Sequence, residues 1–524
     1  MGTHTDRRTL TRRQMLRLSG GLAASLGLGA GYSPALTGAS AATVPAGRKG
    51  GKLRVAHTGD APDLDPHVIT WFKYPIMPQL YNTLIRFDPS RRVQPELAES
   101  WQYAPDRSYL DVKLRKGVKF HSGKELAAED VVYTLERIQD PATASAQLAI
   151  ILKGVKVEAV DPMTARFKLP GPTPALLDAF DRMCIIEKGA KKDDLMRSAN
   201  GTGPFKLVEW RPHNVCRMTR NEAYWKPGKP VVDEIEVQVI ADVSAMIVSL
   251  ETGAIDFAEK IPNHEHERLR RSNQVKLVVS QNPATTYDVL FNVTKPPFND
   301  KRVRQAFSWA ADRKRFVDRI LFGVGKPKSI PWPDISLAYD AALDDTYQFN
   351  LDKAKALLAE AGFPNGMDAH MVISTQGWPE LAKFAEMYQA DLAKINVRLK
   401  LEDMDSARWN TTFNNSRFPQ LITHAFGFAH KDPSLLFTAY PFQPLTGVSG
   451  YRSERYTNLV SQATAEPDTE KRKALYKQIT ELMVDEMWCM VLTPAFGNWG
   501  LRANVTGFAA TLDDLELFED TAVG

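Results

Sequence analysis

The sequence predicts an α/β protein of at least two domains. Its 524 residues exceed what one ordinary hydrophobic core supports. Residues 371–424 alternate strand-like and helix-like apolar patterns in the order strand, helix, strand, helix, strand. Because strands joined by helices pair in parallel, this order indicates a largely parallel sheet. The composition, 44% hydrophobic and 24% charged, is typical of a globular protein.

Residues 110–137 are expected to form a strand, a turn, a second strand, a second turn and a helix. Apolar Leu110, Val112 and Leu114 alternate with charged residues, which is the period of a half-buried strand. Residues 118–121 are expected to resume a strand after the turn at Lys116-Gly117. A helix follows over 129–137, with acidic residues first and an arginine last, as the helix dipole favours.

Similar periodicities predict the other elements. A hairpin is expected over 155–169, with Asp161-Pro162 at its tip. Further strands are expected over 50–56, 206–210, 231–240, 286–293, 371–374, 397–401, 420–424 and 487–493. Further helices are expected over 245–251, 379–395, 406–415 and 470–484, and after the capping residues Asp300, Asp312 and Asn350.

The net charge of +4 is concentrated in the first 41 residues, which carry five arginines and one aspartate. The rest of the chain is therefore electrically balanced. This balance gives no basis for a nucleic-acid-binding face, and no nucleic-acid partner is predicted.

Those first 41 residues are predicted to be an export leader and are excluded from the fold. Thr11-Arg12-Arg13-Gln14-Met15-Leu16 resembles a twin-arginine export motif. Residues 16–36 are only weakly apolar, which suits a leader better than a membrane span. Ala39-Ser40-Ala41 fits a cleavage site, and a disordered basic tail is the alternative. No cysteine lies near that site, so we expect a free periplasmic protein without a lipid anchor.

Cysteine and histidine patterns give little evidence of special chemistry. Cys184, Cys216 and Cys489 are too few for a disulfide framework. The first two could pair in an oxidising compartment, although packed free thiols are preferred. The run 264–267 (HEHE) does not converge on one helix face, so a solvated loop or helix start is favoured and neither a metal ligand nor a cofactor is predicted. The run 201–205 (GTGPF) lacks the features of a nucleotide loop and is expected to be a tight turn.

Several motifs resemble those of a single family. Residues 94–137 contain LAESW, LRKGVKFH and AEDVVYTLER, residues 201–205 read GTGPF, and residues 296–325 contain PFNDKRVRQAF. Together they resemble the extracytoplasmic solute-binding proteins of the peptide/nickel class, which are the dipeptide- and oligopeptide-binding proteins of ABC importers. The resemblance covers essentially the whole chain after the leader. Ala127 departs from it, since the family often has a threonine cap there.

The resemblance implies a two-lobed periplasmic binding protein fold with an enlarged first lobe and a ligand cleft between lobes joined by two hinge strands. Residues 42–286 and 494–524 would form the first lobe and residues 287–493 the second, with crossings near 286–293 and 489–494. It also implies a monomer without catalytic residues. Such a protein captures a peptide or small organic solute by lobe closure and delivers it to inner-membrane permease subunits.

Residues 425–433 (AFGFAHKDP) resemble the family's ligand-contacting motif. Aligned on Asp432-Pro433, the motif places Ala429 where peptide binders hold the peptide ammonium with an aspartate. Alanine cannot pair with a buried ammonium. The loop 375–378 lacks the arginine with which dipeptide binders hold the carboxylate. Both anchors of a free dipeptide are therefore absent, and Asp432 is interpreted as a helix cap.

We therefore predict a ligand held by aromatic and neutral polar side chains. The candidates are Trp71, Tyr74, Gln376, Trp378, Phe426, Phe428 and His430. For each aromatic residue, packing in the core is the alternative. A metal-chelate (nickel-type) binder or sensor on the same fold is the alternative function. A secreted enzyme is a further rival, but the sequence has no nucleophile elbow, zinc motif or dinucleotide fingerprint to support it.

Overall fold

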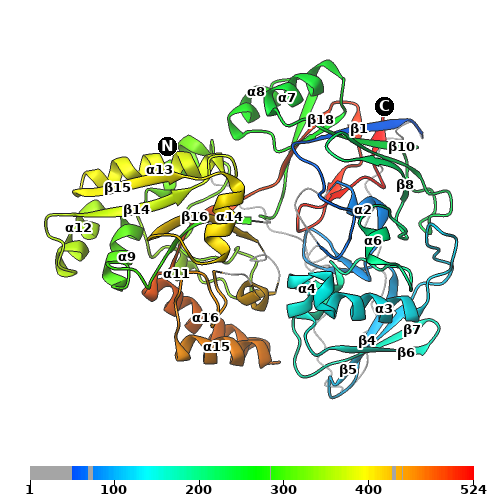
Figure 1. The fold of residues 1–524 in the computed structure, drawn as a ribbon, viewed down its shortest axis with the longest axis horizontal. Coiled ribbons are helices and arrows are strands. Elements are labelled where there is room, and N and C mark those ends of the chain that lie inside the picture. Colours follow the sequence, from blue (N-terminus) through cyan, green and yellow to red (C-terminus); the bar gives the residue numbers. More distant parts are fainter. Residues whose placement is uncertain (1–49, 69–72, 74, 284, 428–431, 439–440) are drawn as a thin grey trace, which may run out of the picture. The chain divides into compact units, whose positions relative to one another are not determined.

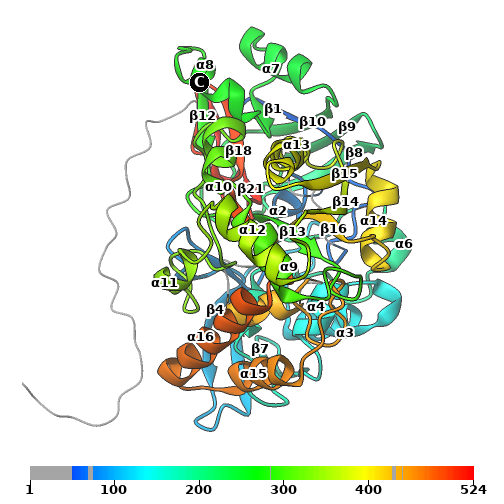
Figure 2. The same cartoon turned by 90° about the vertical axis from the view of Figure 1, so that its left-hand side faces the viewer.

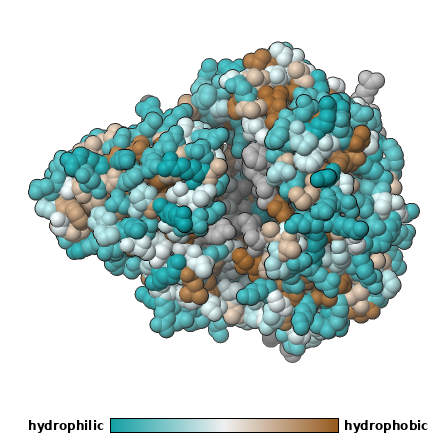
Figure 3. Space-filling view, in the orientation of Figure 1, coloured by the Kyte–Doolittle hydropathy of each residue, from teal (hydrophilic) through white to brown (hydrophobic). Residues whose placement is uncertain are grey.

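The computed structural model describes residues 50–524 except 69–72, 74, 284, 428–431 and 439–440. The predicted leader lies outside these residues. Two large sheets organise the described chain, and each has its own hydrophobic core (Figure 1). Hydrophilic residues predominate on the face in Figure 3, as expected where apolar side chains are collected in cores. Within the described residues, no helix is both long enough and apolar enough to cross a membrane.

The first sheet has seven strands and draws on both ends of the chain. Its order is β12 (Val275–Val279), β18 (Asn498–Arg502), β11 (Phe257–Glu259), β1 (Lys52–His57), β10 (Glu234–Val239), β9 (Val215–Arg220) and β8 (Phe205–Arg211). β1 runs parallel to both β10 and β11. β18 is inserted antiparallel between β11 and β12, so the C-terminal segment completes a sheet that the N-terminal segment begins.

The second sheet has five strands and contains the predicted strand–helix alternation. Its order is β15 (Val397–Asp403), β14 (Met367–Ile373), β16 (Leu421–Gly427), β13 (Thr285–Phe291) and β17 (Cys489–Ala495). β14 is parallel to β15 and β16, and α13 (Pro379–Ala393) and α14 (Ser406–Asn414) form the connections. The parallel arrangement is confirmed for these three strands. β13 runs antiparallel to both of its neighbours, so the whole sheet is mixed.

A smaller sheet has the order β4 (Ala98–Tyr103), β5 (Tyr109–Leu114), β7 (Thr164–Lys168) and β6 (Lys156–Asp161), with α3 (Ala128–Gln139) packed on it. The predicted strand at 110–114 and the hairpin over 155–169 are confirmed. The strand predicted over 118–121 is wrong, because only Lys119 pairs there, in an isolated bridge to Glu125. At the cap of α3, the Asp130 carboxylate accepts a hydrogen bond from the Ala127 N–H at 2.9 Å.

The three predicted capping residues are confirmed. Asp300, Asp312 and Asn350 accept hydrogen bonds from backbone N–H groups two or three residues further on. The remaining helices include α2 (Met77–Leu80), α4 (Ala146–Ile151), α5 (Leu176–Phe180), α6 (Lys192–Leu195), α7 (Val243–Thr252), α8 (His266–Arg270), α9 (Lys301–Trp309), α10 (Arg313–Arg315), α11 (Ala341–Asp344), α12 (Leu351–Glu360), α15 (Glu454–Ala465) and α16 (Thr469–Glu486). α9 and α12 lie side by side (Figures 1 and 2). α15 was not predicted from the sequence.

The chain passes between the two large sheets by two short connections. One leads from β12 to β13 and the other from β17 to β18. The two connections are in contact, because the Ser280 N–H donates a hydrogen bond to the Gly497 carbonyl at 2.8 Å. β13 and β17 are neighbours in the second sheet. The lobe boundaries predicted at residues 286 and 494 stay a prediction.

Candidate ligand-binding site

One edge of the five-stranded sheet brings together residues that are far apart in the sequence. Thr286, near the start of β13, lies opposite Phe426 of β16 on one side and Pro494 of β17 on the other. β14 runs parallel to β16, so the loop after β14 begins at the same edge. Ligands of open α/β sheets collect outside the carboxyl ends of parallel strands. This edge is therefore the candidate site.

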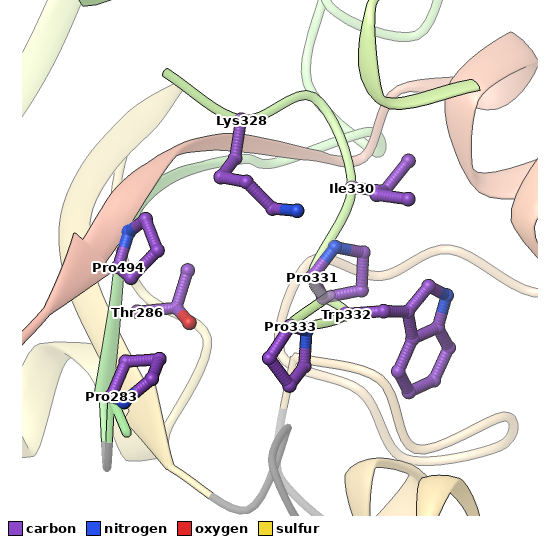
Figure 4. A pocket seen from close by; sticks show the side chains of 8 residues that line it. All are labelled: Pro283, Thr286, Lys328, Ile330, Pro331, Trp332, Pro333 and Pro494. Atoms are coloured by element: carbon purple, nitrogen blue, oxygen red, sulfur yellow. The ribbon is translucent and has the colours of Figure 1, made fainter. Parts of the chain in front are cut away.

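A pocket of about 230 Å³ opens at this edge (Figure 4). Its walls come from the strand ends and from the loop before α11. They comprise Pro283, Thr286, Lys328, Ile330, Pro331, Trp332, Pro333 and Pro494. Four proline rings, one isoleucine and one tryptophan line it together with Thr286 and Lys328, and polar and apolar atoms share its exposed surface about equally. Such a lining offers both apolar contact and hydrogen-bonding atoms to a small group of a ligand.

The loop that carries the second wall is held by buried polar contacts. Lys328 is 2% exposed, and its amine lies 2.5 Å from Asp344 Oδ2 and 3.3 Å from Asp334 Oδ1. Asp344 Oδ1 accepts from the Ser329 N–H at 3.0 Å. Trp332 Nε1 donates to Thr480 Oγ1 on α16 at 2.8 Å. These contacts fix the wall in advance, and two carboxylates neutralise the lysine charge.

Two of the predicted site residues lie on the loop after β14. Gln376 is exposed, and its Oε1 accepts a hydrogen bond from the Ser406 N–H at 3.1 Å. Trp378 is half-buried and packs edge-on against Trp409, with ring centroids 4.7 Å apart. The side-chain amide of Gln376 thus holds the start of α14. Their role in ligand binding stays a prediction.

Phe426 lies in the core of the sheet edge. It is 4% exposed and packs edge-on against Phe442, with ring centroids 4.9 Å apart. A stack of nearly parallel rings behind it includes Phe413 and His424, 4.6 Å apart. His424 Nδ1 lies 3.0 Å from the Asp288 carboxylate on β13. The ring of Phe426 is therefore packed in the core, which was the alternative considered for each aromatic residue.

Trp71, Tyr74, Phe428 and His430 lie outside the described residues, as does Ala429. Asp432 is described, and its capping role is confirmed. Its carboxylate accepts from the Ser434 N–H at 2.9 Å at the start of the 3₁₀ helix Pro433–Thr438, and it also pairs with Arg472 on α16.

The first lobe presents a second and larger pocket of about 530 Å³. It is lined by Pro66, Lys73, Met77, Pro78, Tyr81, Thr83, Arg86, Asp181, Arg182, Cys184 and Leu515. Its cations have acidic partners. Lys73 Nζ lies 2.5 Å from Asp63, and Arg182 Nε lies 2.9 Å from Asp513. Both cations are thus paired within the protein, and the pair of Lys73 with Asp63 holds the loop after β1.

A buried ionic group holds that loop against α3. Arg137 Nη2 lies 2.5 Å from Asp65 Oδ2, and Arg137 Nη1 lies 2.7 Å from His67 Nδ1. Burial lowers the pKa of His67 to about 4, so its imidazole is neutral near pH 7. A neutral ring can accept from Arg137 through Nδ1 and donate through Nε2 to the Cys184 carbonyl, 2.8 Å away.

Hydrogen bonds between described residues join the segments that carry the two large sheets. Asn282 Nδ2 donates to the Pro89 carbonyl at 2.8 Å, and the Asp432 N–H donates to Asp178 Oδ1 at 3.3 Å. Arg91 Nη1 donates to the Ile335 carbonyl at 3.4 Å. Burial lowers the pKa of Arg91, and the charges of Asp178 and Asp432 oppose that shift. The candidate edge is therefore bordered by contacts that both lobes share.

Sequence reasoning missed the pocket wall at 328–333 and its neighbour Thr286. A usable signal was present, because Pro331-Trp332-Pro333 lies in a long stretch without a predicted helix, between Gly325 and Asn350. Long loops of this kind in compact proteins often carry function. An aromatic residue between two prolines marks the point in that loop where a rigid wall is most easily built.

The sequence matches the family model for bacterial extracellular solute-binding proteins, family 5, over residues 92–443. Heme-binding protein A of Haemophilus influenzae is 27% identical over 487 residues, covering 85% of this chain and 87% of that protein. The glutathione-binding protein GsiB of Escherichia coli K12 is 27% identical over 457 residues, covering 84% and 88%. The periplasmic binding protein DppA of Helicobacter pylori, solved with the peptide STSA, is 26% identical with a TM-score of 0.79, covering 91% and 98%. The predicted two-lobed periplasmic binding protein fold is confirmed.

Proposed function

The chain belongs to the bacterial extracellular solute-binding proteins of family 5, and we propose that it closes its two lobes on a small organic solute or a peptide. Membership makes it a solute-binding component of an ABC importer, acting outside the cytoplasm. In our proposal it is a periplasmic monomer without cofactor or catalytic step. It hands its ligand to the permease subunits in the inner membrane.

The observation that carries the proposal is the pocket where β13 and β17 meet the loop at 328–333. It lies beside the two connections between the sheets, at the edge where the ends of β13 and β17 meet. Hydrogen bonds such as that from Asn282 to Pro89 border the same region. A ligand favours the closed state only through contacts that the open state lacks. The residues that line this pocket belong to the second lobe and the connections, so in our proposal the closed state adds contacts from first-lobe side chains to the same ligand.

The lining also supports a choice of ligand chemistry. Six of the eight residues that line the pocket are apolar, and the one charged residue among them, Lys328, is neutralised by Asp344 and Asp334. The sequence lacks both anchors for the charged ends of a free dipeptide. We therefore propose a solute that places an apolar group in this pocket. The proposed further contacts are Trp71, Tyr74, Gln376, Trp378, Phe428 and His430, whereas Phe426 packs against Phe442.

The first experiment is native mass spectrometry of the mature protein, purified without refolding, followed by denaturation and identification of any released molecule. An organic solute with an apolar group supports the proposal. A ligand whose only groups are charged or strongly polar contradicts the proposed pocket chemistry.

A filling substitution tests the position of the site. Thr286→Phe places a ring into a pocket of about 230 Å³, so the affinity for the released solute should fall by on the order of tenfold or more. Isothermal titration calorimetry measures this loss. Thr164→Phe, on β7 of the small sheet and partly exposed, is the matched control and should bind normally. Unchanged affinity in a folded Thr286→Phe protein would contradict the proposal that the solute binds in this pocket.

A further inference from the structure

Three buried side chains from distant parts of the chain converge within the core of the first lobe. His57 ends β1, Glu259 ends β11, and Glu516 belongs to β21 (Glu516–Leu517) near the C-terminus. One ligand atom from each lies within 4.8 Å of those of the other two. Their exposed fractions are 1%, 1% and 2%. No residue of this cluster lines the candidate solute pocket.

Neighbouring groups orient each of the three side chains. His57 Nδ1 lies 3.2 Å from the Gly59 carbonyl, so this nitrogen carries a proton and donates it. Glu259 Oε1 accepts from both the N–H and the hydroxyl of Thr58, at 2.9 and 2.8 Å. Glu516 Oε1 accepts from Trp499 Nε1 at 3.0 Å. Partners of this kind around a ligand shell characterise protein metal sites.

The remaining atoms of the three groups face one another. His57 Nε2 lies 2.6 Å from Glu259 Oε2. Glu516 Oε2 is fully buried and has no hydrogen-bond partner among the described residues. A buried carboxylate oxygen in that condition is costly, and more so when the group is charged. The oxygen thus marks a place where a proton or a cation is needed.

Charge balance also requires a positive partner in the cluster. Two carboxylates this close in a dry core cannot both stay ionised without compensation. A divalent cation would neutralise both carboxylates with the imidazole neutral. A ligand set of one imidazole and two carboxylates suits a zinc-class ion better than calcium, which prefers oxygen alone.

We propose that His57, Glu259 and Glu516 bind one divalent cation of the zinc class. The ion would join the ends of β1 and β11 to the C-terminal segment, which returns to this lobe through β18. Its role is to fasten that segment to the seven-stranded sheet. The competing state is a proton shared within the cluster, either in the 2.6 Å contact of His57 Nε2 with Glu259 Oε2 or on Glu516, with no ion bound.

Metal analysis of the tag-free mature protein tests the proposal. After incubation with Zn²⁺ alone and removal of excess ion, wild type should retain about one zinc per chain. Its thermal unfolding midpoint should rise with Zn²⁺, because an ion that binds only the folded state stabilises that state. Glu516→Gln keeps the acceptor for Trp499 but loses the charge, and it should lose both the zinc and the thermal shift. Glu259→Gln should do the same.

Asp514→Asn is the matched control, since Asp514 is a buried acid two residues away and outside the cluster. It should retain zinc. Cobalt gives a second measurement. With Co²⁺ in place of Zn²⁺, wild type should show visible absorption bands, and Glu516→Gln should not. Wild type with neither retained zinc nor cobalt bands would establish the shared proton and overturn the proposal. Equal zinc retention by wild type and Glu516→Gln would place the ion elsewhere and also overturn it.

Discussion

Asp514 is buried where the two connections between the large sheets touch. Its φ is 60°, and its carboxyl faces Ser280 of one connection and Gly497 of the other. Burial and the neighbouring charge of Asp513 raise the pKa of Asp514 to about 7. Asp513 itself is paired with Arg182. The folded protein therefore holds a proton on Asp514 at pH values where the unfolded chain does not.

This shift predicts a pH dependence of stability. The contribution of the proton is complete below about pH 4, the ordinary pKa of aspartate, and is lost as the pH rises through about 7. Asp514→Asn removes that dependence, so it should raise the thermal unfolding midpoint at pH 8 more than at pH 5. Differential scanning calorimetry at both values measures the effect. Glu99→Gln, exposed on β4, should leave the pH profile unchanged. An unaltered profile in Asp514→Asn would contradict the assigned proton.

At the scale of the element, the turn at 201–205 shows why two of its residues are glycines. A Cβ at Gly201 would lie 2.0 Å from the Leu80 carbonyl oxygen, and one at Gly203 would lie 2.4 Å from that of Gln79. The Gly203 N–H donates to the Leu80 carbonyl at 3.1 Å. The turn is therefore packed backbone to backbone against α2.

Gly203→Ala should destabilise the protein by several kcal/mol, because neither backbone can move without breaking buried contacts. Thermal unfolding measures the loss. Gly171→Ala is the matched control, since a Cβ there meets open space, and its midpoint should stay near that of wild type. Equal midpoints for the two variants would contradict the close approach.

Local patterns explain which elements could be predicted. The strand at 110–114 and the cap at Asn350 depend on neighbours in the sequence, and both are confirmed. The alternation at 118–121 reflects burial of Val118 and Phe120, 1% and 2% exposed, without sheet pairing. The approach of Gly203 to Gln79 joins residues more than a hundred positions apart. No local period records such a contact.

The same reasoning applies to the site. The loop at 375–378 and Phe426 lie at the ends of strands whose parallel order the sequence predicted. Thr286 joins them only because β13 pairs with both β16 and β17, and those pairings are long-range. The metal-type cluster of His57 has the same origin, because it needs the return of the chain end to the first sheet.

At the scale of the whole molecule, Arg91 links the lobes. Its guanidinium donates to the Ile335 carbonyl and lies in the field of Asp178 and Asp432. Removing Arg91 takes away the positive charge that lies near the carboxylates of Asp178 and Asp432. Since Asp432 and Ile335 belong to the chain between β13 and β17, the contact crosses from one lobe to the other.

Arg91→Ala should therefore weaken solute affinity several-fold without touching the pocket, because the closed state loses about 1 kcal/mol. Calorimetry gives the affinity, and small-angle X-ray scattering reports closure. Arg107→Ala is a matched control, since Arg107 also occupies a turn with positive φ, 58° against 62° for Arg91, but packs over Tyr103 within the first lobe. Equal affinities for the two variants would argue against a role of this contact in closure.

The insertion of β18 between β11 and β12 has a consequence for how the protein is made. The ribosome releases β1, β8, β9, β10, β11 and β12 early, yet the place between β11 and β12 stays empty until residue 502 emerges. The seven-stranded sheet, whose first strand is synthesised first, is therefore completed only after all five strands of the second sheet have been synthesised. Until then two strand edges are unpaired, and such edges are where nascent chains aggregate. A chaperone that shields them during synthesis would serve this chain for longer than one whose lobes are each continuous.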